Sequence, residues 1–203
     1  FNNGEKQIAL NNINLLLPSN EKNIELLFLH AKICINLNEI DNANSSLEKI
    51  LNLESNNYEA LKLNYINYLK NNKINLAKKY IDKLLIIEKN NYEFLRDKAY
   101  IEYLNNDYLV SEKYINEALN QNSEEVFGLN ILGLLYVKKD QTLNAINVFK
   151  KAISINPQYS DSYNNLGKCY IDLEKLNLAY LNFKKSYKIN PNSELPLVNI
   201  ANI

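Results

Sequence analysis

Glycine and proline are scarce in this chain, with only four of each in 203 residues. Because glycine most easily makes turns that need a positive φ angle, we expect such turns to be few and helices to be long. Leucine, isoleucine, asparagine and lysine dominate instead. This composition predicts an all-α chain, and we attach no functional meaning to the abundance of asparagine.

The chain has two cysteines, one histidine and no methionine. Cys34 and Cys169 are far apart in the sequence, on what the pattern described below makes different helix pairs, so we expect no disulfide between them. With no CxxC spacing and a single histidine, the sequence predicts no metal site, and we expect no cofactor. Because the chain starts at Phe1 and lacks methionine, we expect it to be a piece of a longer protein.

Long apolar runs are also missing, because asparagine, lysine or glutamate interrupts every stretch before the roughly 18 residues that a membrane-spanning helix needs. We therefore expect a soluble segment that does not insert into a membrane, with the cytoplasm as the favoured compartment. The 23 basic residues are balanced by 23 acidic ones and are scattered among them. Binding nucleic-acid phosphates needs a concentrated basic face, so we predict no nucleic-acid partner.

A period of 34 residues is the main signal in the sequence. The same order of large and small residues occurs twice. In each unit this order indicates two amphipathic helices, which cross where Gly133 or Gly167 lets their backbones approach. The matching residues are Leu129, Leu132, Gly133, Tyr136, Ala145, Phe149, Ala152 and Pro157, and then Tyr163, Leu166, Gly167, Tyr170, Ala179, Phe183, Ser186 and Pro191.

These residues resemble the tetratricopeptide repeat, which has leucine and glycine at its seventh and eighth positions, tyrosine at the eleventh, alanine at the twentieth and an aromatic residue at the twenty-fourth. The resemblance implies an all-α, right-handed α-α superhelix, or solenoid, of antiparallel helix pairs. We expect residues 1–203 to form a single array. It comprises a half repeat at 1–23, full repeats at 24–57, 58–91, 92–125, 126–159 and 160–193, and the start of a further helix at 194–203.

Some units depart from the pattern. His30, Asn64 and Lys98 occupy the seventh position, where leucine is usual, and Glu102 occupies the eleventh, where we expect Tyr103 to take over the packing. A catalytic histidine needs a nucleophile or a carboxylate beside it, so we interpret His30 as a packing or rim residue. The sequence offers no catalytic residues, and we do not expect an enzyme.

Charged clusters have structural interpretations. Ser123 stands with Glu124 and Glu125 before an expected first helix, where we predict that the serine caps the free amide groups. Lysine pairs on the expected second helices could form a basic strip for an acidic partner, but we favour a solvated outer face. These pairs are Lys78 and Lys79, Lys150 and Lys151, and Lys184 and Lys185.

In proteins that this chain resembles, the first helices line a groove, and positions two, five and nine of each repeat point into it. The second position holds Glu25, Glu59, Glu93, Phe127 and Asp161, the fifth holds Phe28, Lys62, Arg96, Asn130 and Asn164, and the ninth holds Lys32, Ile66, Tyr100, Leu134 and Lys168. Acids line one edge, and the middle is apolar. We predict that these residues bind a protein or peptide partner, although a flanking segment of the chain itself could occupy the groove.

The function predicted from these features is a protein–protein interaction scaffold or adaptor. One alternative is the repeat arm of a larger enzyme such as a protein glycosyltransferase, because Asn164, Asn165, Leu166 and Gly167 resemble the asparagine-bearing repeats of that family. Another is an assembly subunit of a multiprotein complex or of a secretion or pilus apparatus. Because the chain is cut inside a repeat at both ends, we also expect exposed end faces through which copies can associate.

Overall fold

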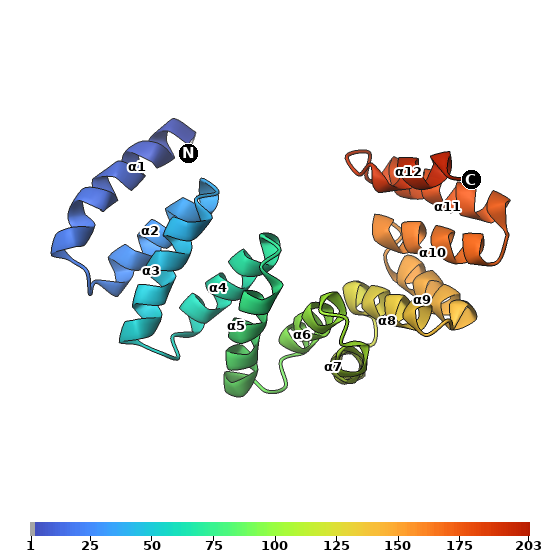
Figure 1. Cartoon of the computed structure of the whole chain (residues 1–203), viewed down its shortest axis with the longest axis horizontal. Coiled ribbons are helices and arrows are strands. Elements are labelled where there is room, and N and C mark those ends of the chain that lie inside the picture. Colours follow the sequence, from blue (N-terminus) through green and yellow to red (C-terminus); the bar gives the residue numbers. More distant parts are fainter. Residues whose placement is uncertain (1–2) are drawn as a thin grey trace. The chain divides into compact units, whose positions relative to one another are not determined.

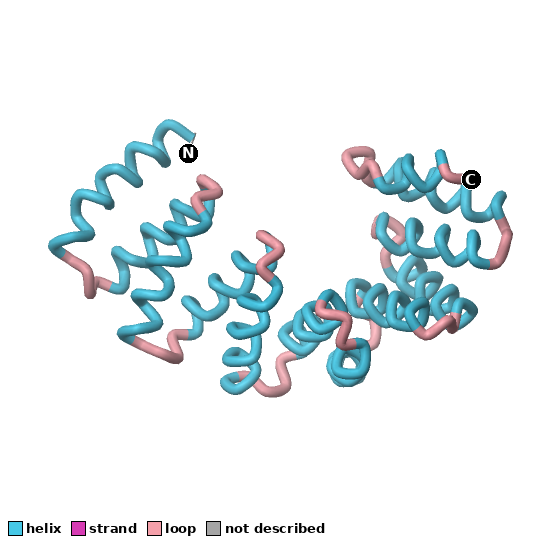
Figure 2. Tube along the Cα trace, in the orientation of Figure 1, coloured by secondary structure: helices cyan, strands magenta, loops and turns pink. Residues whose placement is uncertain are grey.

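The structure, a computed structural model, describes residues 3–203 and contains twelve α-helices, one short 3-10 helix and no strand within that range (Figures 1 and 2). The elements are α1 (Asn3–Leu16), η1 (Leu17–Ser19), α2 (Ile24–Asn36), α3 (Ile40–Leu53), α4 (Tyr58–Lys70), α5 (Ile74–Ile87), α6 (Tyr92–Leu104), α7 (Tyr108–Gln121), α8 (Val126–Lys138), α9 (Thr142–Ile155), α10 (Ser160–Asp172), α11 (Leu176–Ile189) and α12 (Leu195–Ala201). The predicted all-α fold is confirmed.

The helices belong to two compact units. The N-terminal unit ends at Asn90 and holds α1 to α5, and the C-terminal unit, Asn91–Ile203, holds α6 to α12. Within each unit, consecutive helices form antiparallel pairs, α2 with α3 and α4 with α5 in the first, and α6 with α7, α8 with α9 and α10 with α11 in the second (Figure 1). The first helix of each pair starts 34 residues after the previous one, as the sequence period indicates.

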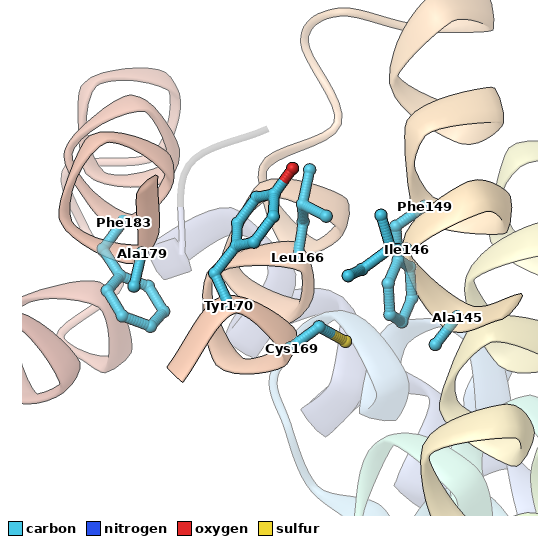
Figure 3. Packing of buried hydrophobic residues seen from close by; sticks show 8 residues of the cluster. All are labelled: Ala145, Ile146, Phe149, Leu166, Cys169, Tyr170, Ala179 and Phe183. Carbon is cyan, nitrogen blue, oxygen red and sulfur yellow. The ribbon is translucent and has the colours of Figure 1, made fainter. Parts of the chain in front are cut away.

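The core of the C-terminal unit lies where the helices of a pair cross. Figure 3 shows side chains of α10, including Cys169 and Tyr170, between those of α9 and α11. A Cβ atom at Gly133 would lie 2.7 and 2.8 Å from Cζ and Cδ1 of the buried Phe149 ring, and Gly167 stands in the same relation to Phe183. The two glycines therefore serve the close helix crossing, as predicted.

Each turn from a first to a second helix contains one residue with positive φ, and none of the five is glycine. The expectation that such turns are few was therefore wrong. The residues are Asn38, Asn72, Asn106, Asp140 and Glu174, with φ between 56° and 62°. Asparagine and aspartate tolerate this left-handed conformation because their short polar side chains bond locally, so part of the asparagine content has a structural role.

Glu174 is the outlier among these turn residues, because glutamate has no special preference for the left-handed region. Its side chain is exposed, and the Lys175 amide bonds the Tyr170 carbonyl at 2.8 Å to close the helix end. We expect Glu174→Asn to raise the free energy of unfolding by about 0.5–1 kcal/mol, measured by urea titration. Glu174→Gln removes the charge but keeps the strain, so a gain of the same size in that variant would contradict this explanation.

Asparagine also begins the first helices. The side chains of Asn23, Asn57 and Asn91 accept hydrogen bonds from backbone amides in the first turns of α2, α4 and α6. In α8 the cap is Glu125, which accepts bonds from the amides of Phe127 and Gly128. The prediction that Ser123 caps this helix was wrong, because a glutamate directly before the helix reaches the same amides.

His30 is a buried packing residue in the N-terminal unit. Its Nδ1 lies 2.7 Å from Ser46 Oγ and its Nε2 lies 3.0 Å from Asn14 Oδ1. Burial lowers the pKa of His30 below the ordinary value of 6.5; Lys49 acts in the same direction and Glu39 opposes them. The structure therefore holds the imidazole in its neutral form.

This pKa shift predicts a pH dependence of stability. The folded chain binds the His30 proton less tightly than the unfolded chain does, so the stability from neutral His30 is fully present above about pH 6.5 and is lost as the pH falls toward the lowered folded value. We expect His30→Asn, which places there the residue found at Asn64 one repeat later, to lose less stability than the wild type between pH 7 and pH 5. Equal losses in urea titrations at the two pH values would contradict this.

Polar groups are buried in α6. Lys98 and Glu102 are only 3% and 1% exposed and form an ion pair of 2.7 Å one helical turn apart. Tyr103, in contrast, is half-buried and packs against Tyr108, with ring centroids 5.7 Å apart. The expectation that Tyr103 takes over the packing of the eleventh position was wrong, because the Lys98 ammonium lets the Glu102 carboxylate stay in the core.

Candidate functional site

Three first helices of the C-terminal unit lie next to one another, because α8 contacts both α6 and α10. They bring together Tyr100 of α6 and Phe127 of α8, whose rings meet edge to face with centroids 5.2 Å apart. The guanidinium of Arg96 lies over the Phe127 ring, 5.5 Å from its centroid. All three side chains are partly exposed, so an aromatic surface with a cation at its border is available to a ligand.

Arg96 is fixed in place by two carboxylates. Its Nη2 donates to Asp97 Oδ1 at 2.7 Å, and its Nη1 lies 3.4 Å from Glu125 Oε1. Burial by itself would lower the pKa of Arg96, but the charges of Asp97, Glu125 and Glu93 and the hydrogen bond to Asp97 outweigh it, and the pKa is raised. Because Glu125 also caps α8, the same carboxylate links the position of Arg96 to the start of the next first helix.

Two tyrosines and an aspartate extend this surface toward α10. Burial raises the pKa of Tyr100, and the Asp161 carboxylate raises it further. Burial also raises the pKa of Tyr159, with added contributions from the charges of Asp161 and Glu125 and from a hydrogen bond to Asp161. Both phenols therefore stay protonated at neutral pH and can donate hydrogen bonds. We call Arg96, Tyr100, Phe127, Tyr159 and Asp161 the aromatic cluster.

The two asparagines predicted at the fifth position are largely buried and connect neighbouring first helices. Asn165 of α10 donates its side-chain amide to Asn130 of α8 at 3.0 Å. Asn199 of α12 donates to Asn164 of α10 in the same way, at 2.8 Å. These amides therefore hold successive repeats together, and the two predicted side chains are nearly inaccessible to a ligand.

The other predicted residues of the C-terminal unit lie outside the aromatic cluster. Leu134 is partly buried and packs against the core that contains Phe149 and Tyr170. Lys168 and Glu93 are exposed. Of the predicted residues in this unit, the structure thus brings Arg96, Tyr100, Phe127 and Asp161 into one cluster.

In the N-terminal unit the predicted residues form a looser arrangement. The Lys32 ammonium lies 5.7 Å from the centroid of the Phe28 ring and 3.9 Å from Glu59 Oε1 on the next first helix. Both ends of this ion pair are about half exposed, so it contributes little to stability. Glu25 is exposed, and Lys62 and Ile66 are partly exposed.

Residues 3–203 contain neither the side-chain groups of a metal site nor a helix suited to span a membrane. No group of three or more histidine, cysteine, aspartate or glutamate side chains there is arranged to hold a metal ion. None of the helices in this part of the chain combines the length and the apolar character that crossing a membrane requires.

Three sequence segments match known repeat families. Residues 24–57 and 160–193 match the family model described as tetratricopeptide repeat, and residues 133–173 match the one described as TPR repeat. No curated protein matches the sequence.

Several solved structures share the fold. A tetratricopeptide repeat protein from Parabacteroides merdae is 21% identical, with a TM-score of 0.72 over 98% of this chain and 77% of that one. MamA is 21% identical, with a TM-score of 0.68 over 83% of this chain and 92% of that one. YrrB, described as a TPR protein with an unusual peptide-binding site, is 18% identical, with a TM-score of 0.65 over 92% and 96%. The likeness confirms the predicted fold class, a helical-repeat superhelix.

Proposed function

We propose that this chain, which belongs to the tetratricopeptide repeat proteins, is a protein–protein interaction scaffold that holds a peptide segment of a partner on its first helices. The observation that carries the proposal is the aromatic cluster. Its rings are partly exposed, and its cation is fixed by two carboxylates before any ligand arrives. A surface prepared in this way loses little conformational freedom on binding, which favours affinity.

The chemistry of the cluster indicates what the peptide offers. An aromatic or aliphatic anchor would pack against Tyr100 and Phe127, and a basic group would suit the carboxylate of Asp161. Within the C-terminal unit, the remaining predicted positions on α6, α8 and α10 extend the proposed surface, and those on α2 and α4 form a separate candidate surface of the N-terminal unit. The division into repeats and the two alternatives, an enzyme's repeat arm and an assembly subunit, stay predictions.

The test uses peptides selected from a display library of random linear sequences on the immobilised chain, with affinities measured by calorimetry. We expect Tyr100→Ala combined with Phe127→Ala to weaken the selected peptides by roughly tenfold or more, because the anchor loses its pocket. Ile86→Ser is the control, since Ile86 is exposed on α5 of the other unit. Equal affinities for the wild type and the double variant would reject the aromatic cluster as the binding surface.

A further inference from the structure

A second groove lies in the C-terminal unit, formed by α9, the end of α10 and the start of α11. It encloses about 450 Å³. Its apolar lining includes Leu143, Ile146, Leu173 and Leu178, and its polar lining includes Lys150 and Lys175. Leu143 is 67% exposed, so its side chain is accessible to a ligand in this hollow. Because second helices supply most of this lining, we call it the second-helix groove.

One other repeat of the same chain has an ion pair at the corresponding positions. In the N-terminal unit, Lys73 Nζ lies 3.1 Å from Asp41 Oδ1. Lys175 stands three periods of 34 residues after Lys73, and Leu143 stands three periods after Asp41. The second-helix groove therefore keeps the lysine of this pair and replaces its carboxylate with an exposed leucine.

The neighbouring repeat of the C-terminal unit shows the same contrast. There Lys139 Nζ lies 2.6 Å from Glu112 Oε2, between α7 and the end of α8. One period later these positions hold Leu173 and Ile146. In the second-helix groove, aliphatic side chains thus replace both carboxylates and one of the two lysines of these bridges, and Lys175 remains beside Lys150.

The charge of the groove is one-sided. Within residues 3–203, neither Lys150 nor Lys175 forms an ion pair, and the lining of this hollow contains no aspartate or glutamate. An adjoining hollow shares Leu143 and Leu173 with the groove and is also lined by Asp140. The unbalanced positive charge therefore lies on the other side of these leucines, at Lys150 and Lys175. A ligand that fits must bring both an aliphatic group and a carboxylate.

We propose that the second-helix groove binds a short acidic segment of a partner protein, with an aliphatic side chain between Leu143 and Leu178 and a carboxylate on Lys175. The carboxylate takes the place that Asp41 holds toward Lys73 in the N-terminal unit. Burial of the aliphatic group supplies most of the affinity, and the charge selects acidic over basic segments. This surface is distinct from the aromatic cluster, so the inference does not depend on the function proposed above.

The probe is a capped peptide of alternating glutamate and leucine, titrated into the isotope-labelled chain and followed by NMR. Peptides with lysine in place of glutamate, or serine in place of leucine, are the comparison. We expect the glutamate–leucine peptide to bind about tenfold more tightly than either, with weaker binding in high salt. A glutamate–leucine peptide that binds no more tightly than both of the others would overturn the proposal.

Leu143→Asp tests the site directly. It places at this position the carboxylate that stands three periods earlier at Asp41, so Lys175 should be neutralised and affinity for the acidic peptide should fall about tenfold. Leu109→Asp is the matched control, because Leu109 has the same repeat position on α7 and is 78% exposed. Both leucines are on the surface, and circular-dichroism melts confirm that each variant folds.

Charge reversal is the second test. Lys150→Glu with Lys175→Glu should transfer the preference to the lysine–leucine peptide, and an unchanged preference would overturn the proposal. Equal losses in Leu143→Asp and Leu109→Asp would also overturn it. If binding instead survives Leu143→Asp but is lost in Tyr100→Ala with Phe127→Ala, the peptide lies on the aromatic cluster, which rejects the second-helix groove and supports the proposed function.

Discussion

Replacing Lys98 by leucine is expected to lower the free energy of unfolding by about 3–5 kcal/mol, although leucine is the usual residue at this position of the repeat. The reason is that Glu102 is almost fully buried and would lose the ammonium 2.7 Å away. A buried carboxylate without its cation is far more costly than the small gain from an added apolar side chain. The measurement is a urea unfolding curve followed by circular dichroism.

The double replacement Lys98→Leu with Glu102→Tyr is the control. It installs the residues found at the same positions in the two following repeats, Leu132 with Tyr136 and Leu166 with Tyr170. Well-packed apolar residues often equal or exceed a buried ion pair in stability, so we expect the double variant to be at least as stable as the wild type. If the single and double variants were equally destabilised, the loss would come from packing and not from the unpaired charge.

Gly133→Ala is expected to destabilise the chain by about 1–3 kcal/mol, and Gly133→Leu by more. The first added carbon would lie within 3 Å of the Phe149 ring, which is completely buried and has little room to move. Alanine is otherwise a better helix former than glycine, so an effect of this sign must come from the helix crossing. A thermal melt of Gly133→Ala equal to that of the wild type would reject the proposed crossing.

The same chain indicates how the loss can be rescued. Where alanine occupies this position, the facing residue is smaller than phenylalanine, as in Ala31 with Leu47 and Ala99 with Ile115. Phe149→Leu alone should leave a cavity, but combined with Gly133→Ala it should recover part of the stability. Purely additive losses in the double-mutant cycle would mean that the two side chains do not compete for space.

The helices could be predicted from the sequence because the period depends on residues that are buried in every pair, such as Ala145 and Phe149. The turns could not, since the absence of glycine concealed positive φ angles that asparagine, aspartate and glutamate supply. The ion pair of Lys98 and Glu102 was also missed, because each residue taken alone is a departure from the pattern. Only their spacing of one helical turn makes the two compatible with burial.

The aromatic cluster was predicted in part. Arg96, Tyr100, Phe127 and Asp161 were predicted because they occupy repeat positions that line the groove in the proteins that this sequence resembles. Tyr159 and Glu125, the carboxylate that holds Arg96, were not predicted as site residues, since both stand directly before a first helix, outside those positions. The sequence did contain a signal at the residue directly before each first helix. This residue is asparagine in the preceding repeats, at Asn23, Asn57 and Asn91. The change to glutamate and tyrosine marks the two repeats whose helix starts contribute to the cluster.

The matched sizes at the helix crossings limit how a chain of this kind can evolve by duplication. Copying a whole pair carries Gly133 together with Phe149, or Ala31 together with Leu47, and leaves each crossing intact. Copying one helix alone would set alanine against phenylalanine, which clashes, or glycine against leucine, which leaves a void. The helix pair is therefore the unit whose duplication preserves the packing at the crossings. Recombination inside a pair is disfavoured because it separates residues of matched size.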